Sequence, residues 1–217
     1  MAPRPSSKRR IGIVIAVLVA GFTAIGVTLA LVGVKADGGY PDADFALTQP
    51  KTLLDGRYTF SEDLSDTSGR RIEKEAESDW EDVRDPRGVV GRYSMGGDAT
   101  KGTLVISGMD GRFKNPDSLR RRMMAPLTDD DKEDVAEPPQ DFTPNGAGIT
   151  VTCEVVSSDT SGTSMTYPLC AWADDNTAAC VALVTSASMG QDPSDVDLEA
   201  AARKTLQVRS ETRKAIE

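Results

Sequence analysis

Cysteines and carboxylates are the side chains of this sequence that could carry out chemistry, because its 217 residues include no histidine. That absence excludes Ser-His-Asp and Cys-His catalysis and every metal site that needs an imidazole ligand. A pair of carboxylates, as in glycoside hydrolysis, is the catalytic device that remains. Glu154, Asp174 and Asp175 are the candidates, but Asp174 and Asp175 are explained more simply as turn residues. We therefore predict no enzyme activity, no cofactor and no metal site.

The three cysteines fall in a segment with the alternating apolar and polar pattern of β-strands. The pattern predicts three strands, over residues 149–155, 165–173 and 178–185. Folding the first hairpin about the middle of residues 157–164 places Cys153 near Cys170. Folding the second hairpin about Asp175 places Cys170 near Cys180. We predict one row of three cysteines across antiparallel strands, and a slip of one residue would turn one of them to the other face.

A structural disulfide is the main expectation for these cysteines. Cys170 can take one partner, and we favour a Cys153–Cys170 bond, while a Cys170–Cys180 bond or no bond remain alternatives. No Cys-x-x-Cys motif or adjacent cluster of cations is present to activate a thiol, which argues against a redox role. Cys180 would then be a buried, inert thiol, and Trp172 should pack over the bond.

Patterns elsewhere predict helices and further strands. The expected elements are a helix over 71–83 ended by Asp85-Pro86, strands over 88–95 and 102–107, a turn at Asp110-Gly111, a helix capped by Asn115 or Asp117 that runs to Met124, and a long C-terminal helix capped by Ser194. Residues 128–144 hold seven acidic residues and three prolines, which predicts an exposed, mobile loop rather than a calcium site. The fold class is therefore α+β, with a mainly antiparallel sheet packed by helices.

Residues 11–34 form an apolar run with no charge and no proline. A helix of this length covers about 36 Å, which is enough to cross a bilayer core of about 30 Å. The cations that precede it are Arg4, Lys8, Arg9 and Arg10. Because basic residues favour the cytoplasmic side, we expect a cytoplasmic N-terminus and an extracytoplasmic remainder. A cleaved signal peptide is the alternative, but the apolar run is longer than such peptides carry.

Small residues recur every four positions in this run, at Gly12, Ala16, Ala20 and Ala24. Such a smooth face lets a second helix approach closely, so a homodimer through it is one interpretation. The other is that small residues are simply common in membrane helices. The lipid bilayer itself is the predicted partner of residues 11–34.

Charge argues against nucleic acid as a partner. The chain carries 25 cations and 34 anions, and residues 1–34 hold four of the cations and none of the anions. The remainder is therefore strongly acidic, which disfavours binding to nucleic acid or to anionic lipid. We expect a cytoplasmic basic tail at 1–10, a transmembrane helix at 11–34, a juxtamembrane linker at 35–50, and one extracytoplasmic domain at 51–217 that includes the 128–144 loop.

Two passages, Pro50–Tyr58 (PKTLLDGRY) and Leu169–Asp174 (LCAWAD), resemble a group of actinobacterial, especially streptomycete, membrane-anchored proteins of unknown function. The resemblance covers most of the outer domain. It implies an inner-membrane anchor, a disulfide near the Cys-x-Trp-Ala-Asp turn and a closing helix, but no activity and no catalytic residues. Cys180 departs from the pattern of that group.

These observations favour a non-catalytic envelope module, anchored in the cell membrane, that binds an envelope protein or a cell-wall component. The alternative is a sensor or carrier that holds a small ligand or a lipid in a groove between sheet and helix.

Overall fold

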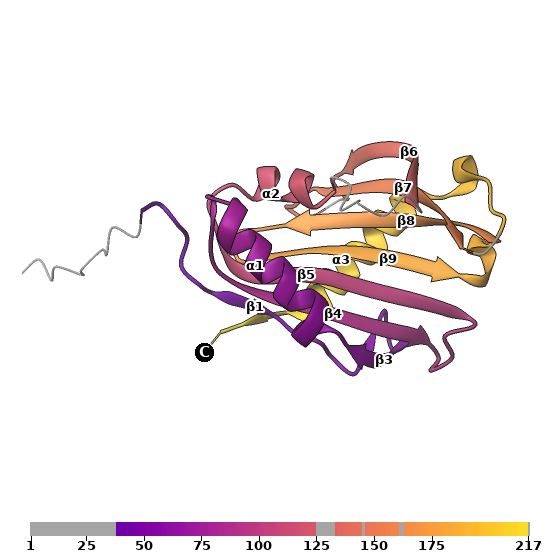
Figure 1. The fold of residues 1–217 in the computed structure, drawn as a ribbon, viewed down its shortest axis with the longest axis horizontal. Coiled ribbons are helices and arrows are strands. Elements are labelled where there is room, and N and C mark those ends of the chain that lie inside the picture. Colours follow the sequence, from indigo (N-terminus) through magenta and orange to yellow (C-terminus); the bar gives the residue numbers. More distant parts are fainter. Residues whose placement is uncertain (1–37, 125–132, 145, 161–162, 217) are drawn as a thin grey trace, which may run out of the picture. The chain divides into compact units, whose positions relative to one another are not determined.

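An antiparallel sheet of eight strands organises the residues that the structure describes, which are 38–124, 133–144, 146–160 and 163–216 (Figure 1). The structure is a computed structural model. The sheet has the order β2-β3-β4-β5-β9-β8-β7-β6. Its strands are β2 (Thr52–Leu53), β3 (Tyr58–Asp63), β4 (Val83–Met95), β5 (Gly102–Phe113), β6 (Glu133–Phe142), β7 (Val151–Thr160), β8 (Thr163–Ala173) and β9 (Thr177–Thr185).

A second, two-stranded sheet pairs β1 (Phe45–Leu47) with β10 (Arg213–Ala215). The predicted basic tail and transmembrane helix, residues 1–34, lie outside the described residues. Within the described residues, no helix is both long and apolar enough to cross a membrane.

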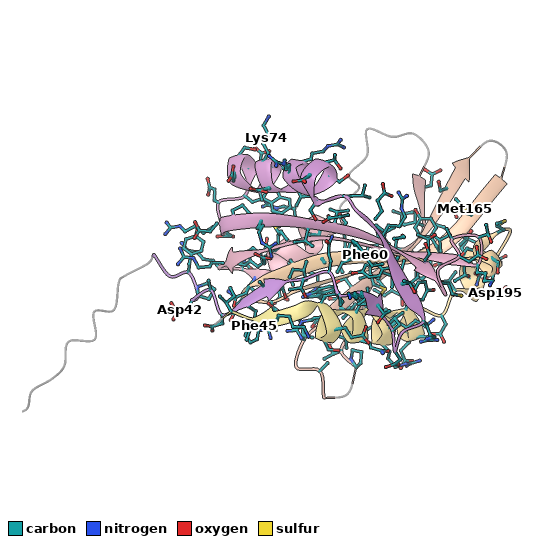
Figure 2. All side chains as sticks on the ribbon, turned by 90° about the horizontal axis from the view of Figure 1, so that it is seen from below. Asp42, Phe45, Phe60, Lys74, Met165 and Asp195 are labelled. Carbon is teal, nitrogen blue, oxygen red and sulfur yellow. A yellow bond between two sulfur atoms is a disulfide. The ribbon has the colours of Figure 1, made fainter. Side chains whose placement is uncertain are left out.

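Helices cover both faces of the large sheet. One face carries α1 (Arg70–Asp79) and α2 (Pro116–Met123), and the opposite face carries α3 (Leu198–Thr212). Figure 2 shows α1 above the strands and α3 below them. Short helical turns occur at Ser65–Gly69, Ser186–Ser188 and Pro193–Asp195. The α+β class and the mainly antiparallel sheet are as the sequence predicts.

Each face of the sheet has its own buried core, as strand alternation requires. Leu104 and Ile106 of β5 belong to the larger core beneath α3, whereas Met109 belongs to the smaller core beneath α1 and α2. Gly108 lies at a close approach of β5 to β9, where a Cβ atom would collide with the backbone of Ala178. The central strands are therefore fixed in position by packing on both sides.

The predicted helix capped at Asn115 is confirmed, because the Asn115 side chain accepts a hydrogen bond from the Ser118 N–H at 3.0 Å. The first helix ends at Asp79, earlier than predicted. The predicted stop signal, Asp85-Pro86, instead lies inside β4, where the register with β5 shifts between Arg84 and Arg87. Pro86 lies at this bulge in the strand and does not end a helix.

The predicted turn at Asp110-Gly111 is wrong, because both residues lie inside β5. Asp110 is buried, and its side chain accepts hydrogen bonds from the Leu47 N–H at 2.9 Å and from Arg87. Long-range partners thus hold a turn-like dipeptide in an extended conformation.

The predicted loop at 128–144 is wrong over residues 133–142, which form β6 at the edge of the sheet. Register shifts separate Val135, Glu137 and Gln140, and the two prolines fall in the second of them. An edge strand tolerates proline because its outer N–H groups bond to no neighbouring strand. Ala136 and Phe142 pack against the larger core and hold the strand in place.

The predicted linker at 35–50 is also wrong in part, because β1 lies within it and pairs with β10. Leu47 is 1% exposed, and its carbonyl accepts a hydrogen bond from Arg87 at 2.9 Å. A strand of three residues is too short to show a period in the sequence. The folded part of the chain therefore begins before residue 50.

The C-terminal helix packs on the disulfide-bearing strands as predicted, but it begins at Leu198. Its cap is Asp197, which accepts from the Ala200 N–H at 2.8 Å. Ser194 belongs to a separate short turn that Asp192 caps. The predicted cap at Ser194 is therefore wrong.

Candidate binding site

A disulfide joins Cys153 on β7 to Cys170 on β8, and it lies in the larger core beneath α3. The two residues are directly opposed in the register of these strands. Trp172, which is 0% exposed, belongs to the same core. Its indole N–H donates to the Thr177 hydroxyl at 3.3 Å. The disulfide and the indole serve the core of the domain.

The predicted row of three cysteines is wrong at Cys180. Cys170 is opposed by Val181, and Cys180 is opposed by Ala171. That difference of one residue turns Cys180 to the other face of the sheet. Its thiol donates to the Met123 carbonyl of α2 at 3.4 Å, and burial raises its pKa to about 12. A thiol in this state is a weak nucleophile.

Glu154 lies on the same face as Cys180 and is 3% exposed. Among the described residues its Oε2 atom has no hydrogen-bond partner. Burial raises the pKa of this carboxyl to about 7, and its charge further raises the pKa of the Cys180 thiol. Burial is the cause of the shift at Glu154, and Glu154 does not line either of the two hollows described below.

Asp174 follows β8 and ties the β8–β9 turn to the end of α3. Its Oδ1 atom accepts from the N–H groups of Asn176 and Thr177, at 3.0 and 2.8 Å. Its Oδ2 atom accepts from Nε and Nη2 of Arg209, at 2.9 and 2.5 Å. Burial alone would raise the pKa of Asp174, but these hydrogen bonds outweigh it and hold the pKa below its usual value.

Arg213, the first residue of β10, also approaches Asp174. Its Nε atom lies 3.2 Å from Asp174 Oδ2, yet the geometry is not that of a hydrogen bond. Its guanidinium carbon lies 3.0 Å above the centre of the Phe45 ring. Two arginines therefore share one carboxylate at the place where the C-terminal helix ends.

Asn176 fixes the other side of this place and is 2% exposed. Its side-chain amide donates to the carbonyls of Asp42, Gly111 and Asp175, at 2.8, 3.2 and 3.2 Å. Its side-chain oxygen accepts from the Asp44 N–H at 3.1 Å. One buried side chain thus holds the segment before β1 against the β8–β9 turn.

These groups surround an open hollow of about 570 Å³ at one end of the sheet. We call it the polar hollow, and its charged lining residues are Asp42, Asp44, Asp117, Arg120, Asp174, Asp175, Arg209 and Arg213. Figure 2 shows Asp42 and Phe45 at this end, and Asp195 and Met165 at the opposite end. The volume lies within the range of small-molecule sites, about 300–1,000 Å³.

Arg120 forms a closed polar network at the edge of the hollow. Its side chain is 4% exposed, donates to the Thr152 hydroxyl at 2.8 Å, and donates to Asp117 at 2.6 Å. Asp141 accepts from the same hydroxyl at 2.5 Å. Arg120 is thus neutralised within the protein.

A second hollow, of about 410 Å³, lies between β6 and the start of α3. It is lined by Glu137, Gln140, Asp197 and Glu199 together with a few apolar residues, so it is acidic. Within the described residues, no three side chains of the Asp, Glu, Cys or His type come together as a metal site.

Sequence reasoning identified Asp174 and Asp175 as turn residues but missed the two arginines that approach Asp174. Arg209 is 35 residues from Asp174, and the Asn176–Asp42 bond spans 134 residues. The late cations of the C-terminal helix were visible, but nothing local shows which carboxylate they meet.

Comparisons with protein families, with curated proteins and with solved structures found no match to this chain. The resemblance to the actinobacterial group therefore stays a prediction.

Proposed function

We propose that this chain is a single-pass membrane protein whose extracytoplasmic domain is a non-catalytic interaction module for an envelope protein or cell-wall component. The proposal rests on the hydrogen bonds and the burial of the candidate catalytic carboxylates. Asp174 accepts hydrogen bonds from two N–H groups and from Arg209 and forms an ion pair with Arg213, and Glu154 is buried in the sheet. Asp175 remains as an exposed turn residue. This arrangement supports binding and not hydrolysis.

The proposed location rests on two features. A Cys153–Cys170 disulfide suits an oxidising compartment outside the cytoplasm. The apolar run at 11–34 follows a basic tail, which favours a cytoplasmic N-terminus. The anchor would hold the domain at the outer surface of the cell membrane, and the face with Gly12 and Ala16 offers a homodimer contact within the bilayer.

Site-specific photo-crosslinking in intact cells tests this function. A photo-reactive residue would replace Asp175 at the polar hollow, and a control would replace Lys74, an exposed residue on α1. We expect one envelope component to crosslink from position 175 and not from position 74. Equal crosslinking from both positions, or none from position 175, would contradict the proposal. A C-terminal tag that external protease fails to reach in spheroplasts would contradict the location.

Small-ligand binding is the second candidate function, and the polar hollow is the observation that favours it. Its lining holds eight charged side chains, which suits a polar ligand rather than a lipid chain.

A further inference from the structure

We propose that the polar hollow binds a short peptide that carries both a free carboxylate and a free amino group. This inference rests on the proposed binding role and names the chemistry of the ligand. It follows from the way in which opposite charges are separated within the hollow.

The floor of the hollow holds two guanidinium groups around one carboxylate. Arg209 and Arg213 both contact the same oxygen of Asp174, at distances of 2.5 to 3.2 Å. Asp174 faces both guanidinium groups, and the neighbouring Asp175 also acts on Arg213 through its charge. The side chains of both arginines are about one-fifth exposed, at 21% and 23%, so each remains open to the hollow. Arginine binds carboxylates in a planar, two-point geometry, so the floor suits the carboxylate of a ligand.

The rim of the hollow carries the opposite charge. Asp42, Asp44 and Asp175 are exposed carboxylates that line it. Asn176 holds all three residues through their backbone atoms, which leaves their side chains unused by that contact. A rim fixed in this way lowers the ordering cost of binding, and it suits an ammonium group.

The separation of charge disfavours simpler ligands. A phosphate or another small polyanion would meet the arginines but would be repelled by three rim carboxylates. A cation alone would meet the rim but would be repelled by the two guanidinium groups of the floor. A zwitterion with its charges at two ends satisfies both regions, and a volume of about 570 Å³ leaves room for more than a single amino acid.

The test uses the full chain, purified in detergent, and tri-alanine with free termini as the probe. Isothermal titration measures its binding beside that of N-acetyl-tri-alanine, tri-alanine amide and inorganic phosphate. We expect saturable binding of the free tripeptide and binding at least about tenfold weaker for each capped form, because each loses one charge-assisted contact. Raised salt should weaken the binding of the free tripeptide.

Substitutions assign the binding to the hollow. Arg213→Gln should weaken binding of the free tripeptide at least about tenfold and leave binding of the amide form unchanged. The double substitution Asp42→Asn and Asp44→Asn keeps the backbone contacts to Asn176. It should weaken binding of the free tripeptide but not binding of the N-acetyl form. Asp195→Asn, an exposed aspartate at the opposite end of the domain, is the matched control (Figure 2).

Several results would overturn the inference. These are no saturable binding of tri-alanine at millimolar concentration, equal binding of the capped forms, tighter binding of phosphate, or unchanged affinity in both hollow variants. Circular dichroism of each variant shows whether it is folded. If Arg213→Gln is misfolded, Arg213→Lys takes its place, and because it keeps the charge but loses the two-point geometry it should weaken binding of the free tripeptide less than about tenfold. If tri-alanine does not bind but crosslinking from position 175 is still specific, this inference alone is overturned. If tri-alanine binds but crosslinking from position 175 is not specific, the proposed function alone is overturned.

Discussion

Replacing Glu154 by glutamine should remove a pH-dependent loss of stability. Glu154 is 3% exposed and one of its oxygen atoms has no hydrogen-bond partner among the described residues. Burial raises the pKa of its carboxyl from 4.5 to about 7 in the folded protein. The folded state therefore binds a proton that the unfolded state releases. Stability falls as pH rises from about 4.5 to about 7, and the loss is complete above the folded pKa.

The size of the effect follows from the shift in pKa. One pKa unit corresponds to about 1.36 kcal/mol, so a rise from 4.5 to about 7 corresponds to about 3 kcal/mol at pH 8. At pH 5 most of this loss has not yet occurred. The stability difference between Glu154→Gln and the original chain should therefore grow by about 2–3 kcal/mol in favour of the variant between pH 5 and pH 8.

Urea unfolding at a series of pH values measures this difference, with fluorescence of the buried Trp172 as the signal. Glu77→Gln, an exposed carboxylate on α1, is the control and should change little at any pH. The two titrations are compared as differences between variant and original chain, so other titrating groups cancel. A Glu154→Gln difference that stays constant from pH 5 to pH 8 would refute a buried, protonated carboxyl at this position.

Three further predictions concern structural contacts. Replacing Cys153 and Cys170 together by alanine should lower the free energy of unfolding by about 3 kcal/mol, measured in urea, because the bond closes a loop of 17 residues. Gly108→Ala should lower the free energy of unfolding by at least about 1–3 kcal/mol, because its Cβ would collide with β9. Gly56→Ala is the comparison: its Cβ would meet open space but its φ is positive, so it shows the effect of backbone strain without a collision. Asn176→Ala should speed hydrogen exchange at residues 42–47 far more than in the remainder of the sheet, since two bonds to that segment are lost.

Local signals in the sequence predicted the elements whose cause is local. The alternating pattern around Cys153 and Cys170 identified β7 and β8, and the middle of the intervening turn gave their correct register. The side chain of Asn115 caps α2 in the predicted way. The apolar spacing in the C-terminal helix identified the face that packs on the sheet. In each case the signal is a short pattern in the sequence, although the packing that it predicts joins residues farther apart.

The register of Cys180 shows where a local rule fails by one residue. The predicted centre of the second hairpin was Asp175, whereas the observed pairing of Ala173 with Ala178 places the centre between Asp175 and Asn176. The Asp174 side chain sets this geometry by accepting from the N–H groups of Asn176 and Thr177. Counting residues between the strands does not reveal these side-chain hydrogen bonds. They nevertheless set the register and so determine on which face of the sheet the Cys180 thiol lies.

The edge strand β6 shows that composition alone misleads where one face of a strand is buried. Acidic residues and three prolines predicted a loop over 128–144, but Ala136 and Phe142 reach the larger core. Proline at an edge strand removes no bond between strands, and exposed acidic residues discourage pairing with another sheet. The same composition is therefore consistent with a protected edge.

The polar hollow depends on contacts between residues that are far apart in the sequence, so no local motif predicts it. Asn176 reaches Asp42 across 134 residues, and Thr48 donates to the Thr212 carbonyl across 164. The first contact holds the segment before β1 against the β8–β9 turn, and the second holds the residue after β1 against the end of α3. Residues that follow the predicted anchor and residues at the C-terminal end of the chain therefore line the hollow together. If that segment were a free linker, as the sequence suggested, Asp42 and Asp44 would have no fixed place, and the separation of charge that selects a zwitterion would not exist.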